Sequence, residues 1–467
     1  MSMIKEFFIG TEISPAYYGE LLDFIHRYYL IPGEFTDIRK EGLKISFRAL
    51  RNDGVIYGEI IGGEDFKLVL EYPQNLEEWA HSIYEDIFTS IQVFEDALRQ
   101  HTVYFAWVEG EEIIPEKPPT RRGMASRGIF GSSMLLVYVL FFGVNIILFI
   151  ILGFYAVIAI LLMQLGIIML SDRIYARMGE WVITEDNPNV HIVQFQLPED
   201  EFRFFIKTMG EDAIVRIKRE IYDVSLANKR PPTCDDARRV LERHGFRCNP
   251  LYERSRTVNL YRIVERAALA FGIPVPEVVL ANTMIANAAA TGPSPGRGLV
   301  LVTTGLLVQL DDDEILAVIG HEMGHLVGRD PIILFSIVSA EFILRLTVLL
   351  PVVIISPILY IIVAMGIIFF VAKFFEARAD LLSAMTLGKP EVLARALRKI
   401  GYQKLALEKR GSQRITGWTA WDPHPPIYFR INRLENLRDY RNIKSPLLQS
   451  AGDVIRGLKE ALLSMFS

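Results

Sequence analysis

Two long apolar segments interrupt an otherwise mixed chain. No charged residue occurs between Arg127 and Asp172, and this run is about twice the ~20 residues that one helix needs to cross a bilayer. We therefore predict a transmembrane hairpin at 129–171, with its turn near Gly143 or Gly153. Arginines lie just before and just after this segment, so both of its ends are expected on the cytoplasmic side.

A second apolar block covers residues 332–373 and contains only two charges, Glu341 and Arg345. These residues are four apart on one helix face and are expected to pair with each other. Prolines in the middle of the block suit a turn, so we predict a second hairpin with helices at roughly 332–350 and 357–373. A single span preceded by a surface helix is the alternative.

The remaining segments have patterns that are typical of globular domains. Residues 1–128 combine a β-meander pattern with two helical stretches, which predicts a small α+β domain followed by a linker rich in proline and arginine. Residues 172–250 repeat a strand-then-helix pattern and are expected to be soluble. The apolar stripe over 446–466 predicts a helix that packs on the body of the protein.

Composition supports the membrane assignment and argues against other classes. Of the 467 residues, 51% are hydrophobic, and the mean hydropathy of +0.26 is high for a wholly soluble protein. The net charge of −5 argues against nucleic acid as the main partner, because phosphate-binding surfaces need an excess of lysine and arginine. The two cysteines, Cys234 and Cys248, are too few for a disulfide scaffold. They could pair with each other, but free thiols in a reducing compartment are the expectation.

The strongest chemical signal is the run His321-Glu322-Met323-Gly324-His325 within a segment of helical period. Asp311 and Glu314 form a capping-box pattern that predicts the start of this helix. Histidines four residues apart face one point, where two neutral imidazoles suit Zn²⁺ and Glu322 can take a proton from bound water. The alternative is an accidental histidine pair on a surface helix. Gly324 costs ~1 kcal/mol of helix propensity, which suggests that another element packs closely there.

A zinc site of this kind needs a third protein ligand. Glu376 and Asp380 follow the second apolar block and lie one helical turn apart. Glu376 could bind the metal, while Asp380 could accept a hydrogen bond from a ligand imidazole. If His321, His325 and Glu376 share one ion, both ends of the block lie on the same side of the membrane. The block must then cross zero or two times, which would exclude the single-span alternative.

At this point the sequence resembles a known family. HEMGH, a membrane insert and then Glu376-Ala-Arg-Ala-Asp380 resemble the HtpX-type integral-membrane zinc metallopeptidases, which are relatives of the CAAX prenyl endopeptidase. Upstream, Asn287-Ala-Ala-Ala-Thr-Gly292 resembles the Asn-Ala-x-Ala-Thr-Gly strand of that family. Downstream, Asp422-Pro-His-Pro-Pro426 and Arg430-Ile431 resemble its His-Pro and Arg-Ile element. The resemblance covers roughly 251–331 and 374–436.

The resemblance implies a role for each matching residue. His321, His325 and Glu376 would bind one Zn²⁺ per chain, and Glu322 would be the general base and then the proton donor to the leaving amine. Asp380 would orient a ligand histidine. His424 and Arg430 would stabilise the oxyanion or balance the charge of the site, although His424 in a proline-rich loop could equally be structural. An extended substrate would pair with the backbone of a strand made of Asn287, Ala288, Ala289 and Ala290.

The predicted fold is an α+β multidomain membrane protein with two transmembrane helical hairpins (about four spans), a zincin-like HExxH catalytic domain and an extra N-terminal α+β domain. Its predicted parts are the N-terminal domain with its linker (1–128), the first hairpin (129–171), a soluble intermediate region (172–250), the first half of the catalytic domain (251–331), the second hairpin (332–373) and the second catalytic half with the third zinc ligand (374–467).

The predicted function is hydrolysis of polypeptides by a multi-pass zinc endopeptidase of the cell membrane, with catalytic and N-terminal domains in the cytoplasm. Membrane proteins or misfolded proteins are the expected substrates, in protein quality control, with the lipid bilayer as surroundings and no nucleic acid. CAAX-type processing of lipidated C-termini is one alternative, for which about four spans are too few to enclose a membrane chamber. A non-catalytic membrane adaptor that binds zinc is the other.

Overall fold

The computed structural model describes residues 2–11, 13–51, 53–63, 66–114, 134–197, 199–208, 211–247, 253–408 and 411–463. Cys248 and the arginines before the first hairpin lie outside these residues, so the predictions made for them stay untested; Cys234 is a free thiol. The chain divides into two compact units. The first contains Met1–Phe105, Ile113–Pro115 and His191–Arg256, and the second contains Ala106–Glu112, Glu116–Val190 and Thr257–Ser467.

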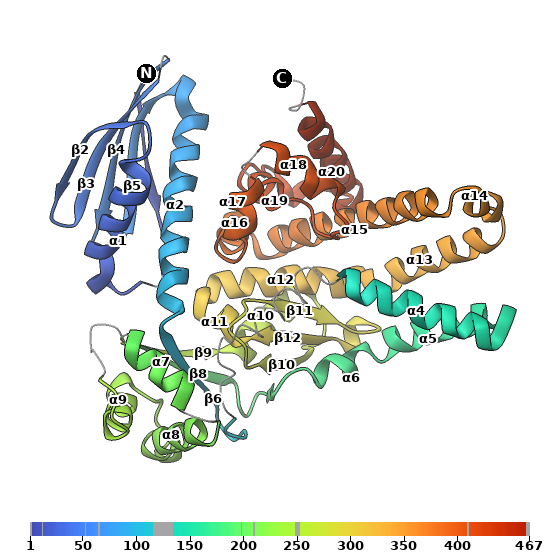
Figure 1. The fold of residues 1–467 in the computed structure, drawn as a ribbon, viewed down its shortest axis with the longest axis horizontal. Helices are drawn as coiled ribbons and strands as arrows, with labels where there is room; N and C mark the ends of the chain where they lie inside the picture. Colours follow the sequence, from blue (N-terminus) through green and yellow to red (C-terminus); the bar gives the residue numbers. More distant parts are fainter. Residues whose placement is uncertain are drawn as a thin grey trace. The chain divides into compact units, whose positions relative to one another are not determined.

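The first unit contains a five-stranded antiparallel sheet of order β1-β5-β4-β3-β2. Its strands are β1 (Ser2–Phe8), β2 (Phe35–Glu41), β3 (Lys44–Arg51), β4 (Gly54–Gly62) and β5 (Phe66–Pro73). Helices α1 (Tyr18–Ile25) and α2 (Glu77–Arg99) pack on one face of this sheet, where alternate strand residues such as Ile56 and Ile60 enter a common core (Figure 1). The β-meander and the two helical stretches predicted for this region are therefore confirmed.

Three further helices of the first unit are α7 (Glu199–Thr208), α8 (Glu211–Val224) and α9 (Cys234–Arg243). A three-stranded sheet has the order β6-β8-β9 and consists of β6 (Thr102–Val108), β8 (Asn189–Gln196) and β9 (Glu253–Asn259). Thr233 and Asp236 form a capping box at the start of α9, and Arg230 donates two hydrogen bonds to the Asp236 carboxylate. This ion pair fixes the first turn of the helix.

The second unit contains a four-stranded mixed sheet of order β11-β12-β10-β7. The strands are β7 (Trp181–Ile183), β10 (Glu277–Ala281), β11 (Ala288–Thr291) and β12 (Leu299–Thr303). β10 and β12 are parallel, and they are apolar and buried apart from Glu277 and Thr303 at their ends, as expected for strands covered on both faces. β11 is antiparallel to β12 and lies at the edge. The same unit contains helices α10 (Leu260–Phe271), α11 (Thr304–Gln309) and α12 (Asp312–Gly328).

The first apolar segment forms a helical hairpin. α4 (Met134–Leu152) and α5 (Ala156–Met169) are joined by the 3₁₀ turn Gly153–Tyr155, where Gly153 has a φ of +55°. Only glycine adopts this left-handed conformation without strain, and Gly153 is one of the two turn positions that the sequence predicted. The short helix α6 (Ser171–Ala176) follows.

The second apolar segment leaves the sheet domain through α13 (Asp330–Leu346) and returns through α15 (Pro357–Leu387), with the short α14 (Leu350–Ile355) between them (Figure 1). The two predicted helices are present with shifted ends. α13 ends before residue 350. α15 continues well past residue 373 because no glycine or proline follows Lys373 before Gly388, which ends the helix in the left-handed conformation. Residues of α5 and α13 share a small apolar core.

By length and hydropathy, two helical segments among the described residues could cross a membrane: Gly143–Met169 and Pro357–Leu387. This is fewer than the roughly four spans that the sequence predicted. The first candidate runs from α4 through the turn at Gly153 into α5 and counts once, and α13 has 17 residues and is about 25 Å long. The two charges in this segment pair as expected: Arg345 donates to Glu341 at 3.2 Å, and the Tyr360 hydroxyl of α15 donates to the other Glu341 oxygen at 2.8 Å.

The C-terminal part of the second unit is helical and surrounds the end of α15. Its helices are α16 (Pro390–Ile400), α17 (Tyr402–Glu408), α18 (Gly411–Thr419), α19 (Ile427–Glu435) and α20 (Pro446–Leu463). Val454 and Ala461 of α20 are buried in a core that includes Ala377 of α15. The prediction that this last amphipathic helix packs on the body of the protein is therefore confirmed.

Candidate metal and active site

Helix α12 carries the HEMGH sequence, and the predicted capping box starts this helix. The Asp311 carboxylate accepts a hydrogen bond from the Glu314 amide at 2.8 Å, and the Glu314 carboxylate accepts one from the Asp311 amide at 3.0 Å. These bonds satisfy backbone amides that have no partner within the first turn. The acidic side chains of this turn also interact favourably with the positive end of the helix dipole. α12 therefore starts at a defined residue, which fixes the direction of the side chains of His321 and His325.

Close packing of α12 on α15 brings the two halves of the site together. A Cβ atom on Gly324 would lie 3.1 Å from the Cα atom of Ala379, and one on Gly320 would lie 2.9 Å from the Ser383 hydroxyl oxygen. Glycine at these positions lets the backbones of the two helices approach more closely than a larger residue would allow. The close approach expected from the glycine inside HEMGH is therefore confirmed, and the packed element is the helix that carries Glu376.

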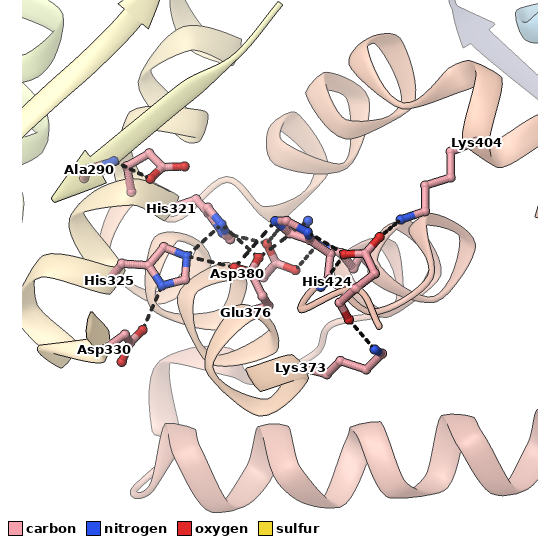
Figure 2. Close-up of polar contacts among 12 residues, drawn as sticks. Ala290, His321, His325, Asp330, Lys373, Glu376, Asp380, Lys404 and His424 are labelled. Atoms are coloured by element: carbon pink, nitrogen blue, oxygen red, sulfur yellow. Dashed lines mark hydrogen bonds and ion pairs between the residues drawn. The ribbon is translucent and has the colours of Figure 1, made fainter. Parts of the chain in front are cut away.

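His321, His325 and Glu376 converge on one point (Figure 2). The two Nε2 atoms are 3.2 Å apart, His325 Nε2 is 3.4 Å from Glu376 Oε1, and His321 Nε2 is 3.5 Å from Glu376 Oε2. Ligand atoms at ~2.05 Å from a tetrahedral Zn²⁺ lie ~3.3 Å from one another. The triangle of donor atoms thus has the size that a zinc ion requires, and two imidazoles with one carboxylate are a ligand set that zinc prefers.

A second observation supports a metal ion at this cluster. The Oε2 atom of Glu376 is buried and has no hydrogen-bond partner among the residues that the structure describes. Arg430 Nη1 lies 3.8 Å from this oxygen, beyond hydrogen-bond distance, and a buried carboxylate oxygen without a hydrogen bond is costly unless a cation binds it. The position of this oxygen beside the two histidines is where a divalent cation would offset that cost.

Each histidine has a carboxylate at its other ring nitrogen. His321 Nδ1 lies 2.9 Å from Asp380 Oδ1, and His325 Nδ1 lies 2.7 Å from Asp330 Oδ2. Such carboxylates select the tautomer that leaves Nε2 free for a metal and fix the orientation of the ring. Arg430 in turn donates two hydrogen bonds to Asp380, at 2.7 and 2.8 Å, from a buried position.

Asp330 and its own partner Arg378 were not recognised as site residues in the sequence. Arg378 donates to Asp330 Oδ1 from α15. The available signal was the acid five residues after His325, directly beyond the helix end. Arg329 adopts the left-handed conformation there, with a φ of +51°, and this turn brings Asp330 back to His325.

The acids around His321 perturb both imidazoles. Burial alone would lower the pKa of His321, but its contacts with Asp380 and Glu376 outweigh burial and raise this pKa to about 10. Burial dominates at His325 and lowers its pKa. The acids beside His321 therefore favour positive charge at that ring. A divalent cation can supply that charge while both rings are neutral, which is the form that binds metal.

Glu322 points to the edge strand of the sheet. Its Oε2 atom accepts a hydrogen bond from the Ala290 amide of β11 at 2.8 Å (Figure 2). Asn287 is held at β12 by hydrogen bonds with Thr303 in both directions. Since pairing alternates along an antiparallel ladder, the backbone groups of Ala288 and Ala290 face away from β12, whereas those of Ala289 face it. The predicted substrate strand is thus an edge strand beside the metal-ligand cluster.

The two remaining candidates have different surroundings. His424 precedes α19, its side chain is 49% exposed, and its Nε2 atom lies 3.7 Å from Glu376 Oε1. Its Nδ1 atom lies 2.8 Å from Asp422 Oδ1, and this aspartate was also missed as a site residue. Arg430 on α19 is buried and lies 3.8 Å from Glu376 Oε2. Its guanidinium group already donates hydrogen bonds to Asp380. Its geometry therefore fits charge balance within the site better than contact with a substrate.

Comparison with known proteins gives the same assignment as the geometry. The model of peptidase family M48 matches residues 254–438. A protease HtpX homolog of Tropheryma whipplei is 31% identical over 38% of this chain and 72% of that protein, one of Pyrococcus furiosus is 30% identical over 38% and 73%, and one of Thermodesulfovibrio yellowstonii is 32% identical over 38% and 74%.

The crystal structure of S. mikatae Ste24p is also similar, with 20% identity over 38% of this chain and 49% of that chain and a TM-score of 0.27. The family model covers both halves of the site, namely the HEMGH helix and the segment with Glu376. Together with the coverage of the relatives, this shows that the chain belongs to peptidase family M48, a family of zinc metallopeptidases.

Proposed function

We propose that the protein is a membrane-embedded endopeptidase that holds one zinc ion per chain with His321, His325 and Glu376 and uses Glu322 as the general base. The observation that supports this best is the triangle of donor atoms, whose sides of 3.2, 3.4 and 3.5 Å suit a tetrahedral ion. Three protein ligands leave one position open, which distinguishes a catalytic zinc site from a structural one.

Bound zinc would lower the pKa of a water molecule to ~7 and polarise the scissile carbonyl. Glu322 lies on the same helix as both histidines and takes the proton of the attacking water, which it then gives to the leaving nitrogen. Asp380 and Asp330 keep the Nε2 atoms of the histidines directed at the centre of the site. His424 stabilises the negative charge that develops on the carbonyl oxygen, and Arg430 balances the carboxylates of the site.

The substrate would lie as an extended strand along β11, with its backbone paired to the outward amide and carbonyl groups of Ala288 and Ala290. A peptide carbonyl would compete with Glu322 for the amide of Ala290, and this exchange would free the carboxylate for proton transfer. Since strand pairing uses only main-chain groups, the site accepts many sequences. Such tolerance suits an endopeptidase that removes membrane or misfolded proteins.

The two hairpins would anchor the enzyme in the cell membrane, and we retain about four spans as the proposal. α12 and the end of α15 form one cluster, so the hairpin between them returns to the side that it leaves. Arg173 and Arg177 directly follow the first hairpin, which favours a cytoplasmic site. The N-terminal domain would lie on the same side.

The decisive experiment replaces Glu322 by glutamine in the purified protein. We expect cleavage of unfolded casein to disappear while zinc content stays near one ion per chain, because the substitution removes the base and leaves the ligands. Glu460→Gln, at an exposed position of α20, is the matched control and should cleave normally. An undiminished rate in Glu322→Gln would refute the proposal. A prenylated peptide assayed in parallel would detect CAAX-type processing.

A further inference from the structure

Lys373 is a fully buried cation next to the candidate active site. It lies on α15 three residues before Glu376, and its side chain is 0% exposed. Its Nζ atom donates to the main-chain carbonyl oxygens of Ala420, at 3.3 Å, and of Asp422. Lys373 is labelled in Figure 2. Burying an ammonium group is costly, and two carbonyl groups offset that cost only when they stay in place. The position of Lys373 and that of the segment 420–424 are therefore coupled.

The same segment carries His424, and Asp422 determines the orientation of this histidine. Asp422 Oδ1 accepts hydrogen bonds from the amide of His424 at 2.9 Å and lies 2.8 Å from its Nδ1 atom. Asp422 Oδ2 accepts a hydrogen bond from Lys404 at 2.7 Å. Two lysines thus hold Asp422, one at its main chain and one at its side chain.

This arrangement leaves the other ring nitrogen of His424 directed at the metal-ligand cluster, 3.7 Å from Glu376 Oε1. The ring itself is half exposed, so packing alone does not fix it. Because Nδ1 is paired with Asp422, Nε2 is the ring nitrogen that faces the reaction. The direction of that nitrogen depends on the position of Asp422, and the position of Asp422 depends on Lys373.

We infer that Lys373 is a positioning residue for hydrolysis: it ties the segment 420–424 to the helix that carries Glu376, so that His424 faces the scissile bond. This inference rests on the proposed function, because it assigns His424 to the reaction. Lys404 supports the same arrangement from the protein surface, where its side chain is 40% exposed.

The test compares Lys373→Met with Lys373→Arg. Methionine has a similar length but donates no hydrogen bond, whereas the arginine side chain can donate to both carbonyl groups. We expect Lys373→Met to lower kcat for casein cleavage roughly 10- to 100-fold, the range for losing an oriented group that stabilises the transition state. KM and zinc content should stay within about twofold of wild type, and Lys373→Arg should recover most of kcat. Lys459→Met, at an exposed lysine of α20, is the control.

A double-mutant cycle with His424→Ala separates positioning from a general structural role. If Lys373 acts through His424, adding Lys373→Met to His424→Ala causes no further loss of kcat. An equal further loss, an unchanged kcat in Lys373→Met, or loss of zinc in that variant would each overturn the inference. Should Lys373→Met fail to fold, Lys404→Met takes its place, since it removes the half-exposed partner of Asp422. We then expect kcat to fall severalfold while KM and zinc content stay unchanged, and an unchanged kcat would overturn the inference.

Amide hydrogen exchange gives a readout that does not depend on catalysis. In Lys373→Met, peptides that contain Trp421, Asp422 and His424 should exchange faster, while those of α12 should not change. Unchanged exchange at these three amides would overturn the tie between Lys373 and the segment. If wild-type protein cleaves no peptide, the proposed function fails, and faster exchange in the variant would still establish the tie by itself.

Discussion

Replacement of Asp330 by asparagine tests whether a residue beyond the ligands controls the affinity for zinc. Asp330 uses both carboxylate oxygens: Oδ2 lies 2.7 Å from His325 Nδ1, and Oδ1 accepts from Arg378. Asparagine has the same shape but only one acceptor, so its amide group would face a donor at one of the two contacts. The ring of His325 would lose its fixed orientation or its tautomer, while the fold around it stays intact.

Loss of a partner of this kind typically lowers metal affinity 10- to 100-fold, which corresponds to about 1.4–2.8 kcal/mol. We therefore expect Asp330→Asn to bind zinc more weakly by this factor when apo-protein competes with a chromogenic chelator. Asp223→Asn, at an exposed position of α8, should bind zinc as wild type does. An affinity within twofold of wild type in Asp330→Asn would show that this contact does not orient His325.

Two further predictions concern packing and charge away from the ligands. Gly324→Ala places a methyl group 3.1 Å from the Ala379 backbone. Such overpacking costs about 1–3 kcal/mol, which exceeds the gain in helix propensity from alanine, so we expect a lower midpoint of thermal unfolding and weaker zinc retention; a raised midpoint would refute the close approach. Hydrogen bonds from Arg230 lower the pKa of Asp236 to about 2, which is below the pKa of an aspartate in the unfolded chain. The stability that this pair contributes is therefore present above about pH 4 and is lost as pH falls towards 2. Because Arg230 is half exposed, Asp236→Asn should cost about 1 kcal/mol at pH 7 and nothing at pH 2 in urea unfolding; an equal cost at both values would contradict the assignment.

Sequence patterns predicted the elements whose causes are local. The helix with HEMGH has its own capping box, its own period and its own glycine, and each of these signals concerns residues within one or two turns. The turn at Gly153 follows from the need for a positive φ in a chain of apolar residues. The expectation that Glu376 lies near the two histidines came from a different source, namely the order of motifs along the chain.

The contacts that the sequence did not predict join residues far apart in the chain or across a sharp turn. Lys373 meets carbonyl groups almost fifty residues later, and a lone lysine at the end of an apolar segment usually indicates only the membrane boundary. Asp330 stands where a helix stops, so its pattern indicated a helix end and gave no sign of contact with His325. The C-terminal end of α15 was missed because hydropathy changes at residue 373, whereas the backbone helix continues to Leu387.

The continuity of α15 has a mechanical consequence for the site. One helix carries the returning arm of the apolar hairpin, the buried Lys373, and then Glu376 and Asp380 one turn apart. A helix transmits a shift along its axis with little loss, because each residue is hydrogen-bonded to the next turn. The three donor atoms suit zinc only within a few tenths of an ångström, so an axial displacement of α15 by one residue, 1.5 Å, would separate Glu376 from both histidines. The glycines of α12 oppose such a displacement, because Gly320 and Gly324 pack closely against Ser383 and Ala379 and a shift would put larger residues at these contacts.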